Sequence, residues 1–215
     1  MYLSELGSRL LDGFLVTLQL LGWSALFATL IGTALGAFRV SPIRPLRALG
    51  TSYVNVFRNT PLVVLFIIAV FGLPVLGIFR GNFFWLAVVA LSTYTAAFVC
   101  EVVRSGVNTV DIGQAEAARS IGMGFSSSLR QVIMPQAFRA VIPPLASVYI
   151  ALAKNTSVAA AFGITEATFQ LSGLQRDFAS RLLFNFAGIA LGYILIVAVI
   201  SLTASRFERR VAVSR

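Results

Sequence analysis

The sequence contains no histidine, one cysteine and a single lysine among its 215 residues. Without histidine, and with only one thiol, it cannot build a histidine–cysteine metal site or close an internal disulfide. The lysine, Lys154, is not part of a phosphate-binding loop of the form G-x-x-x-x-G-K-[ST]. No nucleophile stands near a base in a pattern typical of hydrolysis or group transfer. These absences predict that the chain is not an enzyme and holds no metal.

Charged residues are also scarce, at 12% of the chain against 58% hydrophobic residues. The mean hydropathy of +0.88 leaves too little polar surface to cover a water-soluble globule. Five mostly uncharged stretches are long enough to cross a bilayer core of ~30 Å as helices. The sequence therefore predicts an all-α, polytopic membrane protein with one transmembrane domain over residues 1–215, and spans at about 11–38, 57–76, 83–103, 140–164 and 182–205.

The net charge of +9 fits this topology. With five spans the two ends of the chain face opposite sides, and eleven basic residues fall on one side: Arg39, Arg44, Arg47, Arg104, Arg119, Arg130, Arg139, Arg206, Arg209, Arg210 and Arg215. The positive-inside rule assigns that side to the cytoplasm. We therefore expect the N-terminus outside and the C-terminus inside, and we interpret the basic excess as topology rather than as a nucleic-acid footprint.

The largest segment between the predicted spans, about 104–139, contains the short stretch "GQAEAARSIGMG". Asp111 and Gln114 form a plausible capping box that starts a helix at Ile112. Gly122 suits the end of this helix, because glycine adopts the left-handed conformation without penalty. A second short helix through "FSSSLRQVIM" is expected to stop at Pro135.

Alanines in this stretch would let a partner backbone approach closely, while Glu116 and Arg119 supply charge at the edge. Two interpretations stay open on helix propensity and capping alone. The segment is either a docking surface for another protein or an ordinary loop that caps the helix bundle.

Two polar clusters interrupt the apolar stretches, and a charge at mid-bilayer costs a few kcal/mol even on the lenient insertion scale. The functional interpretation is a route for a zwitterionic or anionic amino acid, in which Arg58 or Lys154 meets a carboxylate. Alternatively, Arg58 reaches the inner surface and the hydroxyls only bond helix backbones. The clusters are Arg58, Asn59 and Thr60, and Lys154, Asn155, Thr156 and Ser157.

Two acidic residues near the predicted span ends are harder to place. Glu101 and Arg104 are one turn apart and are expected to pair on one helix face in a structural role. Glu166 lies near the outer end of the fourth predicted span, where a gate residue and a surface residue are both open interpretations.

The segment around Glu116 resembles the EAA loop of importer-type ABC permeases, whose pattern is EAA, three residues, G, nine residues, I, one residue, LP. Here "EAA" stands at 116–118 and Gly122 follows after three residues, while Val132, Met134 and Pro135 hold the last positions with two conservative departures. Further blocks resemble polar amino-acid permeases of the His/Glu/Gln/Arg uptake group, most of all the glutamate permeases of actinobacteria: "FRNTPL" (57–62), "YTAAFVCEVVRSGVNTVDIGQAEAARSIGMG" (94–124), "VIMPQAFRAVIPPL" (132–145) and "AKNTS" (153–157).

This resemblance implies a type I ABC importer-like transmembrane domain in the plasma membrane of a bacterium. It implies a permease subunit that translocates glutamate or a related polar amino acid, coupled through the EAA loop to a separate ATPase that binds ATP and Mg, while this chain binds no cofactor. The implied partners are a cytoplasmic ATPase dimer, a second permease, identical or homologous, and an extracytoplasmic solute-binding protein. The implied ATPase contacts are Glu116, Ala117, Ala118, Arg119, Gly122 and Met123.

The alternative function is an ion-coupled secondary amino-acid transporter. Such carriers commonly use intramembrane carboxylates or histidine, and inverted repeats. Here histidine is absent, the central polar residues are cationic or neutral, and five spans give no repeat. The sequence therefore favours the importer subunit.

Overall fold

The computed structural model describes residues 2–79 and 82–211, and the regular elements within them are helices, without any β-strand. Helices suit a chain this apolar, because a helix satisfies its own backbone hydrogen bonds in lipid. Four helical stretches are long and apolar enough to span a membrane, namely Tyr2–Val40, Phe83–Asn108, Phe125–Phe162 and Ala179–Arg210. A bent helix pair brings the number to five at most within the described part of the chain.

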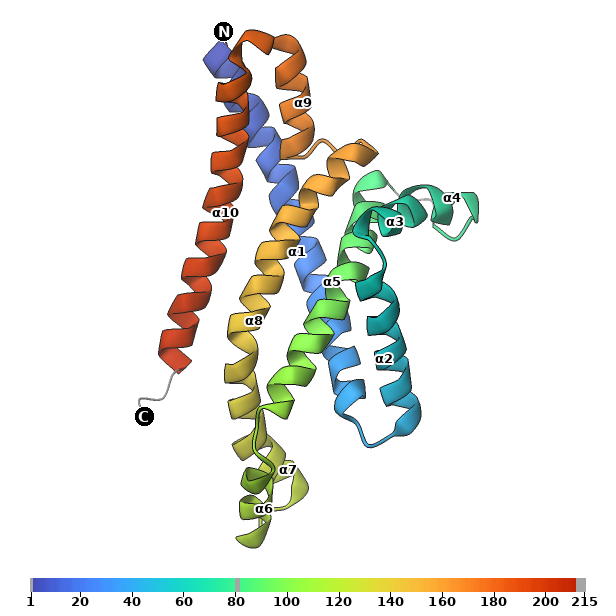
Figure 1. Cartoon of the computed structure of the whole chain (residues 1–215), viewed down its shortest axis with the longest axis vertical. Helices are drawn as coiled ribbons and strands as arrows, with labels where there is room; N and C mark the ends of the chain where they lie inside the picture. Colours follow the sequence, from blue (N-terminus) through green and yellow to red (C-terminus); the bar gives the residue numbers. More distant parts are fainter. Residues whose placement is uncertain (1, 80–81, 212–215) are drawn as a thin grey trace.

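Helix α1 (Tyr2–Val40) packs along α5 (Phe83–Asn108), the most enclosed helix of the bundle (Figure 1). The close approach requires a glycine, since a Cβ at Gly32 would lie 2.6 Å from the Cβ of Val99 on α5. Below this contact, Cys100 is fully enclosed in a small apolar cluster. The cluster consists of Leu35, Val54, Ala97 and Cys100.

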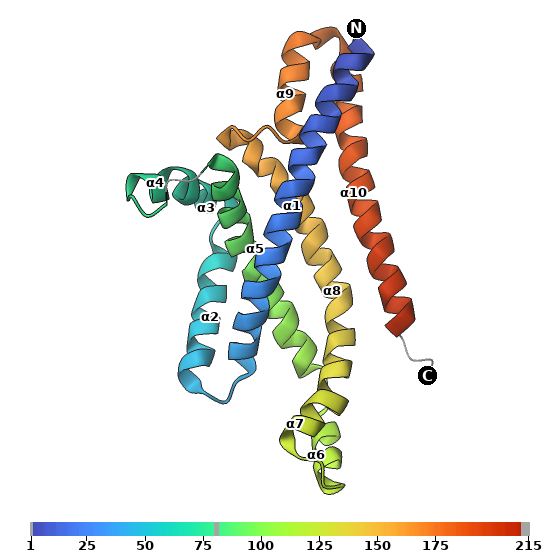
Figure 2. The same ribbon diagram turned by 180° about the vertical axis from the view of Figure 1, so that it is seen from behind.

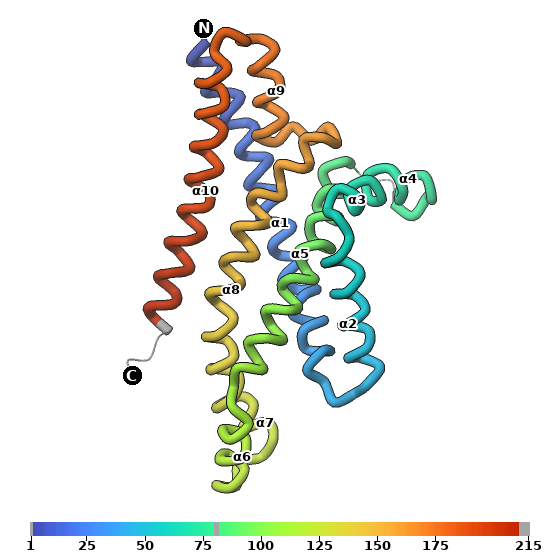
Figure 3. Tube along the Cα trace, in the orientation of Figure 1, coloured from blue at the N-terminus to red at the C-terminus, as the bar shows by residue number. Residues whose placement is uncertain are grey.

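The second predicted span differs from the structure. In place of one helix over 57–76, α2 (Arg44–Asn59) is followed by α3 (Leu62–Ile67), a π-helical turn (Ile68–Gly72) and α4 (Leu73–Val75), and the pair is bent by 102°. The trace in Figure 3 shows α3 and α4 turned away from α2. Pro61 is the cause, because it lacks an amide hydrogen and pushes Thr60 into the extended conformation (φ −92°, ψ 127°).

The fourth predicted span begins earlier and ends earlier than expected. Helix α8 (Met134–Asn155) runs through Pro135, at which the sequence predicted a stop. Proline is tolerated there because the first helical turn has no intrahelical use for its amide. Lys154 accordingly stands at the end of α8 rather than mid-helix, and a 3-10 helix (Thr156–Phe162) follows.

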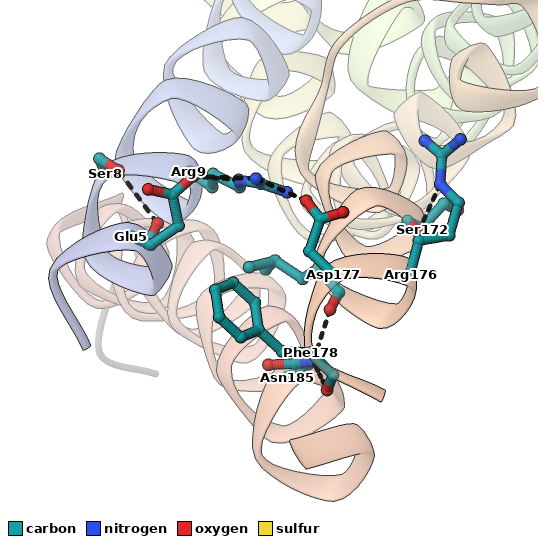
Figure 4. A network of polar contacts seen from close by, with 9 residues as sticks. Glu5, Ser8, Arg9, Ser172, Arg176, Asp177, Phe178 and Asn185 are labelled. Atoms are coloured by element: carbon teal, nitrogen blue, oxygen red, sulfur yellow. Dashed lines mark hydrogen bonds and ion pairs between the residues drawn. The ribbon is translucent and has the colours of Figure 1, made fainter. Parts of the chain in front are cut away.

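The end of the bundle that carries the N-terminus is closed by α9 (Ala167–Asp177) and a 3-10 turn (Ala179–Arg181) that leads into α10 (Leu182–Val211). Figure 4 shows Arg9 of α1 bridging to Asp177 of α9 at 2.7 Å and to Glu5 at 2.9 Å. Asn185 of α10 donates to the carbonyl oxygens of Leu174 and Phe178 at 3.1 and 3.3 Å. Through α9, these contacts join the first helix, α1, to the last helix, α10.

The opposite end of the molecule carries the loop between α5 and α8. There α6 (Ile112–Ser120) and α7 (Phe125–Ser128) project beyond the long helices, and a π-helical turn (Leu129–Ile133) joins them to α8. The view from behind in Figure 2 shows the same projection, and shows α10 diverging from α1 toward the C-terminal end of α10.

Candidate docking segment and polar clusters

Residues 112–128 are here called the docking segment, and their first helix, α6, begins and ends as its local sequence predicts. The second predicted helix is shorter than expected, because α7 ends at Ser128 and a π-helical turn continues into α8. The Asp111 carboxylate accepts a hydrogen bond of 2.6 Å from the Gly113 amide and so caps α6. At the other end the Met123 amide donates to the Ala118 carbonyl and the Gly122 amide to that of Arg119, which is the Schellman pattern. Gly122 has φ +84°, a conformation that other residues adopt at a cost.

The docking segment presents a mixed charged and apolar surface. Ile112, Glu116 and Arg119 are exposed and share one face of α6 by their spacing, whereas Ala118 faces inward and is 5% exposed. Ala117 and Gly122 are exposed as well, and Met123 is partly buried. Charged and small residues therefore stand where a partner could reach them.

Three large apolar side chains of this segment are exposed, which the sequence analysis did not predict. Ile112, Ile121 and Phe125 are 76%, 78% and 80% exposed. Bulky apolar side chains clustered on a projecting, otherwise polar segment are typical of an interaction site. Their presence among alanines, serines and glycines was the available signal.

The first polar cluster is split between two roles. The Asn59 and Thr60 side chains donate to the backbone carbonyls of Asn55 and Val56 at 2.7 and 2.8 Å, so they serve the end of α2. Arg58 instead reaches toward α5, where its guanidinium lies 5.4 Å from the centre of the Phe98 ring. Arg58 is therefore the member of this cluster that faces the bundle.

Arg58 belongs to a larger group centred on Glu101 of α5. Three arginines surround this carboxylate: Arg104 from α5 at 2.9 Å, Arg58 from α2 at 3.5 Å, and Arg39 from the end of α1. The expected ion pair between Glu101 and Arg104 is present. The sequence did not predict that Arg39 and Arg58 also contact Glu101. One carboxylate thus joins three helices and leaves an excess of positive charge.

The residues of the second polar cluster face two different pockets. Lys154 and Ser157 line a pocket of about 320 Å³ with Thr168 of α9 and Tyr193 of α10. Asn155 lines a different pocket of about 360 Å³, between α5 and α8, whose other walls include Thr95 and the same Phe98 that Arg58 covers. The structure therefore places Lys154 and Asn155 on different sides of α8.

Two hydroxyls of this cluster bond the helix backbone, as the structural alternative proposed. Thr156 is fully enclosed and donates to the Ala153 carbonyl at 2.7 Å, and Ser157 donates to the Lys154 carbonyl at 2.7 Å. Lys154 itself is exposed, and Asn155 is partly buried. Of the second cluster, the two side chains free to meet a solute are therefore Lys154 and Asn155.

Glu166 is neither exposed nor a partner of any arginine or lysine among the described residues. It caps α9 by accepting from the Phe169 amide at 2.9 Å, and it accepts from the Tyr193 hydroxyl of α10 at 2.6 Å and from Thr17 of α1 at 3.4 Å. Desolvation by its surroundings raises the pKa of this carboxyl, and the hydrogen bond from Tyr193 opposes the rise. Glu166 therefore connects α1, α9 and α10 by hydrogen bonds inside the bundle.

Comparison with known proteins places this geometry among membrane transport components. Residues 28–213 match the family described as binding-protein-dependent transport system inner membrane component. A glutamate transport system permease protein, GluC, of Corynebacterium efficiens is 41% identical over 99% of this chain and 98% of its own. The glutamate/aspartate import permease protein GltJ of Escherichia coli is 35% identical over 93% of this chain and 86% of its own.

The three-dimensional comparison agrees with the sequence comparison. A crystal structure described as an amino acid ABC transporter with histidines matches with a TM-score of 0.88 and 31% identity, over 98% of both chains. The match extends from α1 to α10, so the projecting docking segment and the bent second span belong to an arrangement that a solved transporter shares.

Proposed function

The chain belongs to the family of inner membrane components of binding-protein-dependent transport systems, and from this premise we propose that it is the permease subunit that carries glutamate or a closely related amino acid in an ABC importer. It is a multi-pass membrane protein, and its relatives are transport permeases rather than enzymes. The comparisons favour this function over an ion-coupled secondary transporter.

The observation that carries the proposal is the docking segment in a chain of this family. It projects beyond the long helices and exposes Glu116, Arg119 and three large apolar side chains. A separate cytoplasmic ATPase dimer, which binds ATP and Mg, would receive this surface, with contacts at Glu116, Ala117, Arg119, Gly122 and Met123. Ala118, which the sequence also predicted as a contact, faces inward and would pack beneath this surface. The chain itself would bind no cofactor.

The proposed orientation puts the docking segment in the cytoplasm and the N-terminus outside. The positive-inside rule supports it, and the N-terminus and the docking segment lie at opposite ends of the molecule. A second permease, identical or homologous, would complete the pathway, because two pockets of this chain open on its sides. An extracytoplasmic solute-binding protein would deliver the amino acid.

For the substrate, we propose that positive charge along the path meets a carboxylate. Lys154 is exposed in a pocket with the Ser157, Thr168 and Tyr193 hydroxyls, and Arg58 stands above Phe98 at the pocket that Asn155 lines. Asn59, Thr60 and Thr156 bond the backbone and would shape the path rather than touch the solute.

A double variant tests the coupling role. Glu116→Lys with Gly122→Asp reverses a charge and puts a side chain at the left-handed turn, so uptake of labelled glutamate into cells should fall at least ~10-fold, about 1.4 kcal/mol of coupling. The protein should remain in the membrane fraction, because the segment lies outside the bundle.

The matched control makes the same two changes at the other end of the molecule. Asp12→Lys with Gly77→Asp reverses an exposed charge and fills a second left-handed glycine, at φ +69°. This control should keep most of the uptake. Normal uptake by the docking-segment variant, with normal membrane content, would exclude the coupling role.

A further inference from the structure

Helix α5 is packed against other helices on three sides and is open on the fourth. It meets α1 at Val99, α2 at Thr93 and α8 at Gly106. Each residue turns a helix by about 100°, so the strip left between α2 and α8 carries residues spaced by four and three positions. These residues are Tyr94, Phe98 and Glu101, all of them partly buried. The open strip therefore presents two aromatic rings and a carboxylate on one face.

The pocket of about 360 Å³ between α5 and α8 lies at this strip, and three polar side chains line it without a partner. They are Thr95, Ser147 and Asn155, and none of their side chains forms a hydrogen bond with another residue in the described part of the chain. Thr95 is 3% exposed, yet its hydroxyl does not bond the helix backbone as that of Thr93 does at 2.7 Å. An unpaired polar group inside a fold costs free energy, so these groups are suited to a polar occupant.

Arg58 of α2 stands at the edge of this pocket. Its guanidinium lies 5.4 Å from the centre of the ring of Phe98, which is one wall of the pocket. Arg39 and Arg104 donate hydrogen bonds to Glu101. Arg58 approaches the same carboxylate only to 3.5 Å, and its side chain forms no hydrogen bond with the described residues. The N–H donors of Arg58 are therefore available to a carboxylate, which a guanidinium binds in a bidentate manner.

The charges around Arg58 favour a further anion. Three arginines share the carboxylate of Glu101, and no aspartate or glutamate is found among the described residues that line the pocket. Partly enclosed charges are normally paired, so a second carboxylate beside Arg58 would be stabilised there. An amino acid carries such a group.

The pocket that Lys154 lines differs in this respect. Its Ser157 hydroxyl already donates to the Lys154 carbonyl at 2.7 Å, and the hydroxyls of Thr168 and Tyr193 bond each other at 3.2 Å. Tyr193 also donates to Glu166 at 2.6 Å. The hydroxyls around Lys154 are therefore already paired, whereas the polar groups of the pocket between α5 and α8 are not.

We propose that the pocket between α5 and α8 is the solute site of the permease, and that Arg58 binds a carboxylate of the amino acid there. The neutral side chains of Thr95, Ser147 and Asn155 would bond its ammonium group and remaining polar atoms. The carboxylate is either the α-carboxylate, which every amino acid carries, or that of an acidic side chain. The inference rests on the proposed function, since it takes the solute to be an amino acid. It narrows that function to one pocket, with Lys154 outside the site.

The test measures the binding of labelled glutamate to the full chain, purified in detergent with the subunits that accompany it. The solute-binding protein is left out, so that its own selectivity does not enter the result. Glutamine and 4-aminobutyrate serve as competitors. Glutamine lacks the side-chain carboxylate of glutamate, and 4-aminobutyrate lacks the α-carboxylate, so the two compounds separate the two sources of the carboxylate.

Arg58→Gln should weaken the binding of glutamate roughly tenfold to a hundredfold, because a charge-assisted hydrogen bond is lost. An equal loss for glutamine, with none for 4-aminobutyrate, assigns the α-carboxylate to Arg58, and the reverse assigns the side-chain carboxylate. Arg47→Gln is the matched control. It makes the same change at an exposed arginine near the start of α2 and should leave the three affinities unchanged.

Thr95→Val tests the pocket without a change at Arg58. Valine has nearly the shape of threonine but no hydroxyl, so the binding of glutamate should weaken roughly fivefold. Because the Thr95 hydroxyl has no hydrogen-bond partner within the described residues, the melting temperature of the protein should not fall. This variant decides the question if Arg58→Gln does not fold.

Three results would overturn the inference. One is unchanged binding of glutamate by Arg58→Gln with a normal yield of folded complex. Another is the absence of glutamate binding by the wild-type complex. The third is a loss of binding in Lys154→Gln together with unchanged binding in Thr95→Val, which would put the solute in the other pocket. In each case, uptake of labelled glutamate by cells that contain the solute-binding protein would leave the proposed function standing. Failure of that uptake would remove the proposed function as well.

Discussion

Glu101 and Glu166 are both drawn into the fold, one toward each end of the molecule, but their surroundings differ. Glu101 is part-exposed and faces three arginines from α1, α2 and α5. Glu166 is fully enclosed, and the described residues that donate hydrogen bonds to it are neutral, among them the Phe169 amide and the hydroxyls of Tyr193 and Thr17. The first joint depends on charge, and the second depends on hydrogen bonds.

This difference implies different responses to the same substitution. A buried charge is strongly destabilising when its partner is removed, whereas a hydrogen-bonded group can be replaced by a neutral one that keeps the bonds. Replacing each glutamate by glutamine removes the charge and preserves the shape. The two positions should then separate clearly.

The largest effect is expected at Glu101. Glu101→Gln leaves Arg39, Arg58 and Arg104 close together without a carboxylate, and should lower the free energy of unfolding by about 2–4 kcal/mol. Thermal unfolding of the purified protein in detergent measures this. Glu116→Gln is the control, since Glu116 is exposed on the docking segment and should change stability by no more than ~0.5 kcal/mol. Equal effects at the two positions would show that the arginines do not depend on Glu101.

A smaller effect is expected at Glu166, and it should follow hydrogen bonding rather than charge. Glu166→Ala removes the cap of α9 and the partner of the Tyr193 hydroxyl, and should cost about 1–3 kcal/mol. Glu166→Gln keeps an acceptor oxygen and should cost less. Hydrogen exchange of the peptide 164–177 reports the loss locally. If glutamine proved as harmful as alanine, the negative charge would be essential at this joint too.

The smallest effect is a dependence on pH. Because burial raises the pKa of Glu166, the folded protein holds this proton more tightly than the unfolded chain does. The stability that this group contributes is therefore full below the ordinary carboxyl range and is lost as pH rises through the raised pKa. The difference in melting temperature between wild type and Glu166→Gln should show this slope from acidic to neutral pH. A flat difference would mean that the carboxyl titrates normally.

Local signals made the docking segment predictable. Asp111 and Gly122 form hydrogen bonds with residues two and three positions away in the chain. The start and end of α6 therefore followed from the sequence. The divergence of Lys154 and Asn155 was also within reach, because consecutive residues on a helix point about 100° apart. The three exposed apolar residues of the segment were predictable as well, because large apolar side chains are unexpected among small and polar neighbours.

Long-range contacts made the rest unpredictable. Arg39 meets Glu101 across 62 positions, and Thr17 meets Glu166 across 149. No local sequence pattern predicts contacts between residues so far apart in the chain. Helix α2 was missed for another reason: its arginines lower the hydropathy, so the start of the second span resembled a loop and Pro61 appeared to lie within a helix rather than at a bend.

The enclosed position of Cys100 makes the native chain suitable for cysteine-directed labelling. It is the only thiol of the sequence and has no solvent-exposed surface, and a thiol in apolar surroundings reacts slowly. A cysteine introduced at the exposed Ser126 on α7, and another at the exposed Ser201 on α10, would therefore take up a pair of dyes without prior removal of the native residue. Energy transfer between the two dyes would follow the docking segment relative to the bundle during single transport cycles.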